Sequence, residues 1–380
     1  MKKSLIALAV FGAFSGAAMA QGSNVQLYGI IDMGLTHFTG ISNGAGGTTS
    51  STGLSSGVDN ASRIGIKGSE DLGGGLSTIF DVETGYCAAG LSQGATTTGS
   101  GEQTYCTGGG FMQRQAWVGL KGDFGTLTAG RQYVPAFLNE ANADPFGYGM
   151  TGQSANLSLT LNTRSPFDLL LLRWNQDVQY STPNLSGFTG HVAYSFAPFS
   201  GGTVPTATTP DVTRAVALDG GYANGPVAVS LDYTQIKNLA TIASTATATE
   251  GDLKFWQATG TYDFGVAKLG AAYEHVTQDS VPGNAQSWFL GVTVPVGAGA
   301  VLASYGQNKN TMVYSSNATA KQYAVGYTYA LSKQTTLYAT YAHISNDSNT
   351  AYTVGDSTDG FSGVAGQSAS GTTVGIDVMF

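Results

Sequence analysis

The charged side chains of this sequence fall on single faces of alternating segments, where they could act together. In an extended strand Arg63 and Lys67 point to one side and the isoleucines between them to the other. Asp81 and Glu83 share a face of the next segment, and Arg173 opens a further one. Basic residues on one wall and carboxylates on another would set an electric field across a narrow water-filled space and select among ions. The alternative is that each residue is only a solvated charge.

Groups that make or break covalent bonds are not brought together by the sequence. No histidine belongs to a His-x-x-x-His or Glu-x-x-His metal motif, and the four lie on separate segments: His37, His191, His275 and His343. The glycine-rich run 44–47 lacks the strand, the helix and the lysine of a phosphate-binding loop. We therefore expect neither a metal nor another cofactor.

Two cysteines, Cys87 and Cys106, lie in a connection rich in glycine and threonine. An even number of cysteines in an exported chain favours a disulfide between them, and the alternative is two free thiols in a mobile loop. Because no histidine is near, the pair makes a poor zinc site.

The elements that would position these residues are strands with two different faces. Tyr323, Val325, Tyr327 and Tyr329 alternate with small or polar residues, and a similar alternation resumes over 335–345. Large side chains mostly share one face, whereas the other face is rich in Gly, Ala and Thr and poor in charge. Such a strand suits lipid on one side and water on the other.

The composition agrees with strands in a membrane. Charged residues make up 11% of the chain, against roughly 25% in ordinary soluble domains. The 54 glycines favour short strands joined by turns over long helices. Beyond the N-terminus no apolar run reaches the roughly 18 residues of a membrane-spanning helix. The same alternation continues to the end without a charged or proline-rich linker, which indicates one domain.

Residues 1–20 have the pattern of a cleaved signal peptide. Lys2 and Lys3 precede an apolar run, and 18–20 (AMA) form a small-x-small cleavage site. The mature protein would be a single domain over 21–380. Removing the two lysines lowers Lys plus Arg from 16 to 14 against 24 Asp plus Glu, which gives a net charge of −10. We do not expect so acidic a chain to bind nucleic acid.

The alternation predicts about sixteen strands, with 38–61 as a long connection. We expect them at 25–37, 62–69, 76–85, 111–122, 124–132, 168–180, 188–196, 214–224, 227–236, 253–263, 266–276, 285–294, 299–307, 320–330, 335–345 and 371–380. An open sheet edge in hydrocarbon would leave backbone groups unpaired, so the last strand must pair with the first. The predicted fold is all-β, an antiparallel 16-stranded transmembrane β-barrel with short periplasmic turns and long external loops.

Five segments carry a family resemblance that spans nearly the whole mature chain. They are 25–32 (VQLYGIID), 62–76 (SRIGIKGSEDLGGGL), 114–120 (RQAWVGL), 130–132 (GRQ) and the terminal Phe380. On these residues the chain resembles the trimeric general porins of Gram-negative outer membranes, in particular the β-proteobacterial and neisserial type. The resemblance implies a water-filled channel for passive diffusion of ions and small hydrophilic solutes.

The resemblance also implies a third loop, here 133–167, that folds inward and narrows the channel. Its stretch 144–149 (DPFGYG) is similar to the tip of that loop in the family, and we expect Glu140 and Asp144 to add negative charge there. The alternative is a flexible external loop.

Two arginines fit this scheme less simply. The resemblance suggests basic wall positions at Arg114 and Arg131, yet strand parity turns both toward lipid. An arginine in mid-bilayer would cost about 2–4 kcal/mol. A place near a strand end, a bulge that resets the register, or contact with a neighbouring subunit would each resolve the conflict.

The partners implied by the resemblance are two further copies in a homotrimer, outer-membrane lipid and lipopolysaccharide, and the barrel-assembly machinery. In the family that machinery reads a terminal aromatic residue such as Phe380, which could equally be an aromatic of the membrane interface. We expect a channel with weak anion selectivity and not an enzyme, although the net charge of −10 opposes that sign. A surface adhesin with a plugged barrel and a barrel-embedded hydrolase are the competing functions.

Overall fold

The structure is a computed structural model that describes residues 24–89, 112–158, 171–199, 213–240, 250–279, 281–313, 316, 318–356 and 360–380. Almost all regular structure in these residues is β-sheet. The elements are β1 (Asn24–Ser42), β2 (Thr48–Ser56), β3 (Arg63–Gly73), β4 (Leu76–Gly85), β5 (Gln115–Gly122), β6 (Gly125–Tyr133), α2 (Pro135–Ala143), the 3-10 helix η2 (Ser154–Asn156), β7 (Arg173–Ser181), β8 (Phe188–Ser195), β9 (Arg214–Asn224), β10 (Val227–Ala240), β11 (Glu250–Asp263), β12 (Lys268–Gln278), β13 (Ala285–Val296), β14 (Gly299–Asn310), β15 (Thr319–Ala330), β16 (Thr335–Asn346) and β17 (Ala369–Met379).

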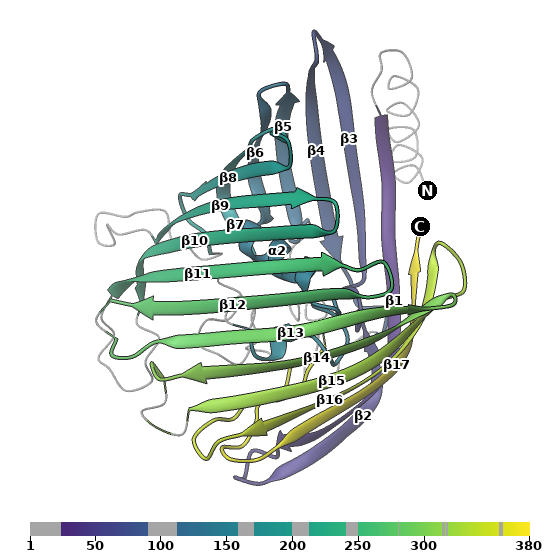
Figure 1. The fold of residues 1–380 in the computed structure, drawn as a ribbon, viewed down its shortest axis with the longest axis vertical. Helices are drawn as coiled ribbons and strands as arrows, with labels where there is room; N and C mark the ends of the chain where they lie inside the picture. Colours follow the sequence, from purple (N-terminus) through teal and green to yellow (C-terminus); the bar gives the residue numbers. More distant parts are fainter. Residues whose placement is uncertain are drawn as a thin grey trace, which may run out of the picture.

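The sheet closes on itself where the first strand meets the last (Figure 1). From β3 to β17 each strand pairs antiparallel with the next, and β17 pairs with β1 from Ile30 opposite Met379 to Thr39 opposite Ser370. Phe380 extends this seam, because its backbone N–H and carbonyl both bond to Gly29. The predicted pairing of the two ends is confirmed.

The other edge of β1 holds two strands in succession. β2 lies opposite 33–42 and β3 lies opposite 24–30, so both occupy one position in the ring. The 17 strands found among the described residues therefore fill sixteen positions. This confirms the predicted antiparallel 16-stranded β-barrel.

The prediction of one long connection over 38–61 is wrong. β1 continues to Ser42, and β2 (9 residues) occupies nearly half of the remainder. β2 does alternate, since Leu54 is 59% exposed outside and Ser55 is fully buried. Its other residues are mostly Ser, Thr and Gly, whose small size leaves little hydrophobic periodicity to detect.

The outer and inner faces differ as the alternation predicts. On β10 Leu231 is 68% exposed on the outside, whereas its neighbours Ser230 and Asp232 are buried inside. Aromatic residues stand on the outer face, where the rings of Tyr233 and Trp256 lie 4.4 Å apart. An apolar outer surface with aromatic residues is typical of a barrel surrounded by lipid.

The helices of the described residues, α2 and η2, lie between β6 and β7, in a segment that the structure describes over 134–158 and 171–172 (Figure 1). We call it the inner loop. Within the described part of the chain, no helix is both long and apolar enough to cross a membrane.

One residue near this loop, Trp174, points to the opposite side from the one that strand alternation indicates. Trp174 shares strand parity with Val178, yet it is fully buried in a cluster with Val134 and Ala136 of the inner loop. The pairing of β6 with β7 shifts register across Gly130 and Gln132, which lie opposite this part of β7. A bulge of this kind reverses the side to which the preceding residues point.

Candidate functional site

The inner loop crosses the inside of the wall where the strands carry glycine. A Cβ atom at Gly270 of β12 would lie 1.8 Å from the carbonyl oxygen of Ala143. A Cβ atom at Gly291 of β13 would lie 2.3 Å from Cγ of Pro145. Glycine at these positions lets the backbone of Ala143 and the ring of Pro145 rest directly on the sheet.

Polar side chains of neighbouring strands attach α2 to the wall. Asn139 Nδ2 donates to the carboxylates of Asp219 on β9 and Asp232 on β10, at 3.1 and 3.2 Å. Gln257 Nε2 of β11 donates to Glu140 Oε2 at 2.9 Å. Because the attachment extends over three adjacent strands, the helix has a fixed position inside the barrel.

The carboxyl group of Glu140 lies between the loop and the wall. The residue is 1% exposed, and Ser158 Oγ lies 3.1 Å from Glu140 Oε2 and 3.0 Å from Glu274 Oε1 of β12. The prediction that Glu140 lines the channel is therefore corrected, because its side chain is used to dock the loop.

Asp144 fixes the turn that follows α2. Its carboxylate accepts hydrogen bonds from the backbone N–H groups of Phe146, Tyr148 and Ser154, at 3.0, 3.3 and 2.8 Å. Burial raises the pKa of Asp144, and these hydrogen bonds offset part of the rise. Like Glu140, Asp144 stabilises the loop and does not present its charge to the channel.

The tip of the inner loop is held by residues 57–62, which separate β2 from β3. The backbone N–H of Met150 donates to the carbonyl of Val58 at 2.6 Å. Residues 57–62 are fixed in turn by Asp32 of β1, whose carboxylate accepts a hydrogen bond from the N–H of Asp59 at 2.5 Å. The segment 57–62 between β2 and β3 thus binds the tip of the inner loop inside the barrel.

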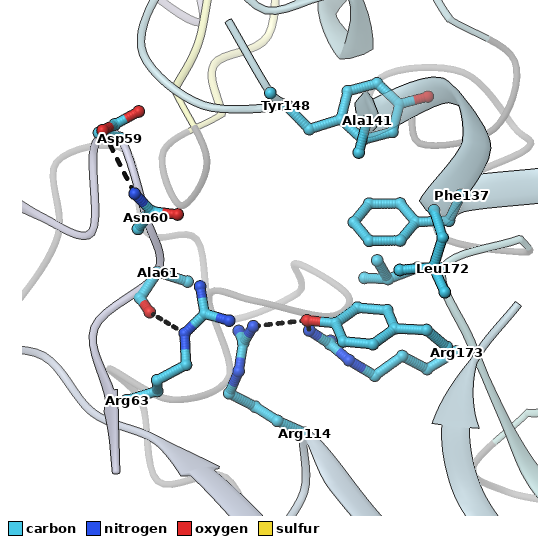
Figure 2. A pocket seen from close by; sticks show the side chains of 13 residues that line it. Asp59, Asn60, Ala61, Arg63, Arg114, Phe137, Ala141, Tyr148, Leu172 and Arg173 are labelled. Carbon is cyan, nitrogen blue, oxygen red and sulfur yellow. Dashed lines mark hydrogen bonds between the residues drawn. The ribbon is translucent and has the colours of Figure 1, made fainter. Parts of the chain in front are cut away.

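A pocket of about 240 Å³ lies between the inner loop and the wall (Figure 2). Arg63, Arg114 and Arg173 converge on it, and we call it the arginine pocket. The hydroxyl of Tyr133 accepts hydrogen bonds from Arg114 Nη2 at 2.7 Å and Arg173 Nη2 at 2.5 Å. The guanidinium carbon of Arg173 also lies 4.2 Å from the centroid of the Tyr133 ring. Three basic side chains are therefore gathered around one tyrosine.

Glu83 is the carboxylate nearest to these arginines. Arg114 Nε donates to Glu83 Oε1 at 2.7 Å, and Arg63 Nη1 lies 3.8 Å from Glu83 Oε2. Within the described residues, two carboxylates, Glu83 and Asp59 on the opposite side of the pocket, face three guanidinium groups, so the formal charge there is positive.

Lys67 and Asp81 belong to a separate pocket of about 320 Å³, which Trp117 also lines. Tyr28 donates its hydroxyl hydrogen to Asp81 Oδ1 at 2.8 Å, and Lys67 Nζ lies 4.9 Å from the centroid of the Tyr28 ring. The charged faces predicted for β3 and β4 are on the inside, but these two residues do not join the arginine pocket.

Arg114 and Arg131, which the resemblance and strand parity assign to opposite sides, have different surroundings. Arg114 immediately precedes β5, so strand parity does not apply, and the residue is 2% exposed. Arg131 lies at the register shift between Gly130 and Gln132, where its Nη1 donates to Asn175 Oδ1 at 2.6 Å. Arg131 therefore has its own partners and does not line the arginine pocket.

Apolar residues that the sequence analysis did not single out complete the arginine pocket. Phe137, Leu138 and Ala141 of α2 line it together with Tyr148 from the loop tip (Figure 2). The intervals from Tyr133 to Phe137 and from Phe137 to Ala141 are four residues, which is the spacing of one helix face. This signal is short and lies among strand patterns, so it was missed.

The remaining predictions concern metal ligands, histidines and cysteines. Among the residues that the structure describes, no group of three or more His, Cys, Asp or Glu side chains is arranged to hold a metal ion. His191 is paired with Asp219 on the neighbouring strand. Cys106 and residues 1–20 lie outside the described residues, so the disulfide with Cys87 and the signal peptide stay predictions.

A family model described as Gram-negative porin matches residues 6–349. The chain belongs to the Gram-negative porin family. Outer membrane porin protein 32 of Delftia acidovorans is 34% identical over 387 residues, which cover 100% of both chains. An outer membrane porin of Bordetella pertussis is 30% identical over 380 residues, which cover 89% of this porin and 93% of that one. A solved anion-selective porin from Comamonas acidovorans has a TM-score of 0.76 and 27% identity, and covers 94% of this porin and 100% of that chain.

These relatives confirm the predicted family, function and location. The porin lies in the outer membrane, and the interior of its β-barrel is a channel for general diffusion of small hydrophilic solutes. The candidate site therefore lies in a passage for solutes, where charged and apolar side chains act on the solutes that pass.

Proposed function

We propose that this porin is weakly selective for anions and that selection occurs in the arginine pocket. The observation that carries the proposal is the convergence of Arg63, Arg114 and Arg173 on a space where the described carboxylates are two, Glu83 and Asp59. Glu140 and Asp144 of the inner loop are turned away and buried, so their charges do not cancel the arginines.

The magnitude of the expected effect is small for each charge. One unit charge about 10 Å from an ion in water changes the free energy of that ion by about 0.4 kcal/mol, or about twofold in local concentration. A net excess of one or two positive charges therefore supports weak selectivity. The overall charge of the chain matters less, since exposed charges farther than about 8–10 Å are screened by salt. The similarity to a porin described as anion-selective supports the same sign.

We also propose that the porin is a homotrimer without enzymatic activity, embedded in outer-membrane lipid and lipopolysaccharide and folded by the barrel-assembly machinery. The sequence motifs imply the trimer. The position of Phe380 at the end of the closing seam, where it remains 49% exposed, is compatible with recognition of this residue before the barrel closes.

The test of selectivity is the reversal potential of the purified porin in a planar bilayer under a KCl gradient. We expect the wild-type potential to have the sign of chloride preference. Arg63→Ala and Arg173→Ala should each lower the chloride-to-potassium permeability ratio by about twofold or more. Lys333→Ala, which removes a positive charge from the turn between β15 and β16, serves as the control. Unchanged potentials in both arginine variants would remove the arginine pocket from the mechanism.

A further inference from the structure

The side of α2 that faces the arginine pocket is apolar. Leu138 is 45% exposed, and Phe137 and Ala141 line the same space. The polar residues Asn139 and Glu140 point instead to the wall, where they bond to β9, β10 and β11. In a channel that conducted only hydrated inorganic ions, an exposed leucine on this helix would have no use, since exposed apolar surface is unfavourable in water.

The aromatic rings beside the arginines form a continuous stack. Tyr133 and Phe137 have centroids 4.9 Å apart and planes within 8° of each other, and Phe137 and Tyr148 lie 5.1 Å apart at 27°. The guanidinium group of Arg173 covers the other side of Tyr133. The stack therefore leads from the cationic end of the pocket to the loop tip, and all three of its rings line the pocket together with Leu138.

We propose that the arginine pocket binds small aromatic monocarboxylates on their way through the channel, with the carboxylate at the arginines and the ring against α2. This inference rests on the proposed anion selectivity and names the class of solute. Arginine presents paired N–H donors that match a carboxylate. The rings of Phe137 and Tyr148 and the side chain of Leu138 offer the edge-to-face and apolar contacts that an aromatic ring prefers.

The opposite side of the pocket argues against a second carboxylate on the solute. Asp59 lies across from the arginines, beside Asn60 and near Tyr148 (Figure 2). Because this side chain is acidic, a second carboxylate on the solute would find no cation there. The volume of about 240 Å³ is below the roughly 300–1,000 Å³ of sites for drug-sized ligands, so it suits an acid with a single ring.

The experiment measures block of single-channel chloride current in a planar bilayer by sodium benzoate, with sodium acetate as the aliphatic probe and terephthalate as the aromatic diacid. We expect benzoate to block reversibly at a concentration about tenfold lower than acetate, and terephthalate to block more weakly than benzoate. Leu138→Ser and Phe137→Leu should each remove most of the difference between benzoate and acetate.

A matched control is Leu185→Ser, which alters a leucine that is 58% exposed in the short turn between β7 and β8. Benzoate and acetate should block this variant at the same concentrations as they block the wild type. Equal potency of benzoate and acetate in a chloride-selective channel would overturn the inference and leave the proposed function intact. Benzoate block that persists in both α2 variants would place binding elsewhere and also overturn it. A wild-type protein without anion selectivity would overturn both proposals.

Discussion

At the scale of single residues, Tyr133 organises the arginine pocket. Its hydroxyl accepts hydrogen bonds from two arginines that come from different strands, and its ring supports the guanidinium group of Arg173. Like charges in one place repel one another, so a shared acceptor is needed to hold them. Glu83 has the same function for Arg114 and Arg63 from the other side.

Tyr133→Phe tests this role because it keeps the ring and removes only the shared acceptor. A hydrogen bond to a charged group contributes roughly 1.5–3 kcal/mol, so we expect the two arginines to lose their fixed positions. The chloride preference should fall, and open-channel current noise should rise. Tyr222→Phe is the matched control, since that hydroxyl accepts only from the exposed side chain of Asn224 among the described contacts. An unaltered reversal potential in Tyr133→Phe would show that the hydroxyl does not organise the charges.

At the scale of elements, the position of the inner loop follows from the glycines of the wall. Strands normally gain from large side chains, and a glycine inside a strand marks close approach of another backbone. Gly270 meets the backbone of Ala143 in this way, and Gly291 leaves room for the ring of Pro145. The width of the channel therefore depends on residues of β12 and β13 that carry no functional group.

Gly270→Ala tests the dependence of channel width on the wall. Its Cβ atom would lie 1.8 Å from the Ala143 carbonyl oxygen, so the end of α2 must move away from the wall and into the channel. We expect lower single-channel conductance and a stability loss of about 1–3 kcal/mol from overpacking. Gly220→Ala is the control, because a Cβ atom there meets nothing within 4 Å. Equal conductance in the two variants would contradict the proposed contact.

At the scale of the whole molecule, stability depends on closure of the ring. Every backbone group in hydrocarbon needs a partner within the protein, and the seam between β1 and β17 supplies the last of them. Phe380 continues the seam by bonding to Gly29, and its ring covers that glycine on the outside.

Gly29→Ala tests the seam. A Cβ atom there would lie 2.4 Å from Cζ of Phe380 and 2.9 Å from the backbone oxygen of Arg63, so both the ring and the strand must shift. We expect a loss of about 1–3 kcal/mol in urea unfolding from lipid vesicles and a smaller folded fraction on unheated SDS gels. Gly260→Ala is the control, since the nearest atom there is Val229 Cγ1 at an ordinary 3.6 Å. If both variants unfold alike, Phe380 does not stabilise the closure.

Particular residues show how far the sequence predicted the structure. Asp81 and Glu83 lie inside because side chains alternate along a regular strand. Trp174 departs from parity because of the register shift between β6 and β7, two strands that are separated by the whole inner loop. β2 was missed because its small hydroxyl side chains carry little hydrophobic signal.

The sequence by itself determined the class of fold. Alternation with period two, few charges and no long apolar helix leave a closed barrel as the structure in which all backbone groups are paired in lipid. Only the tertiary structure decided which side chains meet. Arg63 of β3, Arg114 just before β5 and Arg173 of β7 come together, and Glu140 turns to the wall, because contacts between residues distant in the chain depend on register, bulges and the path of the inner loop.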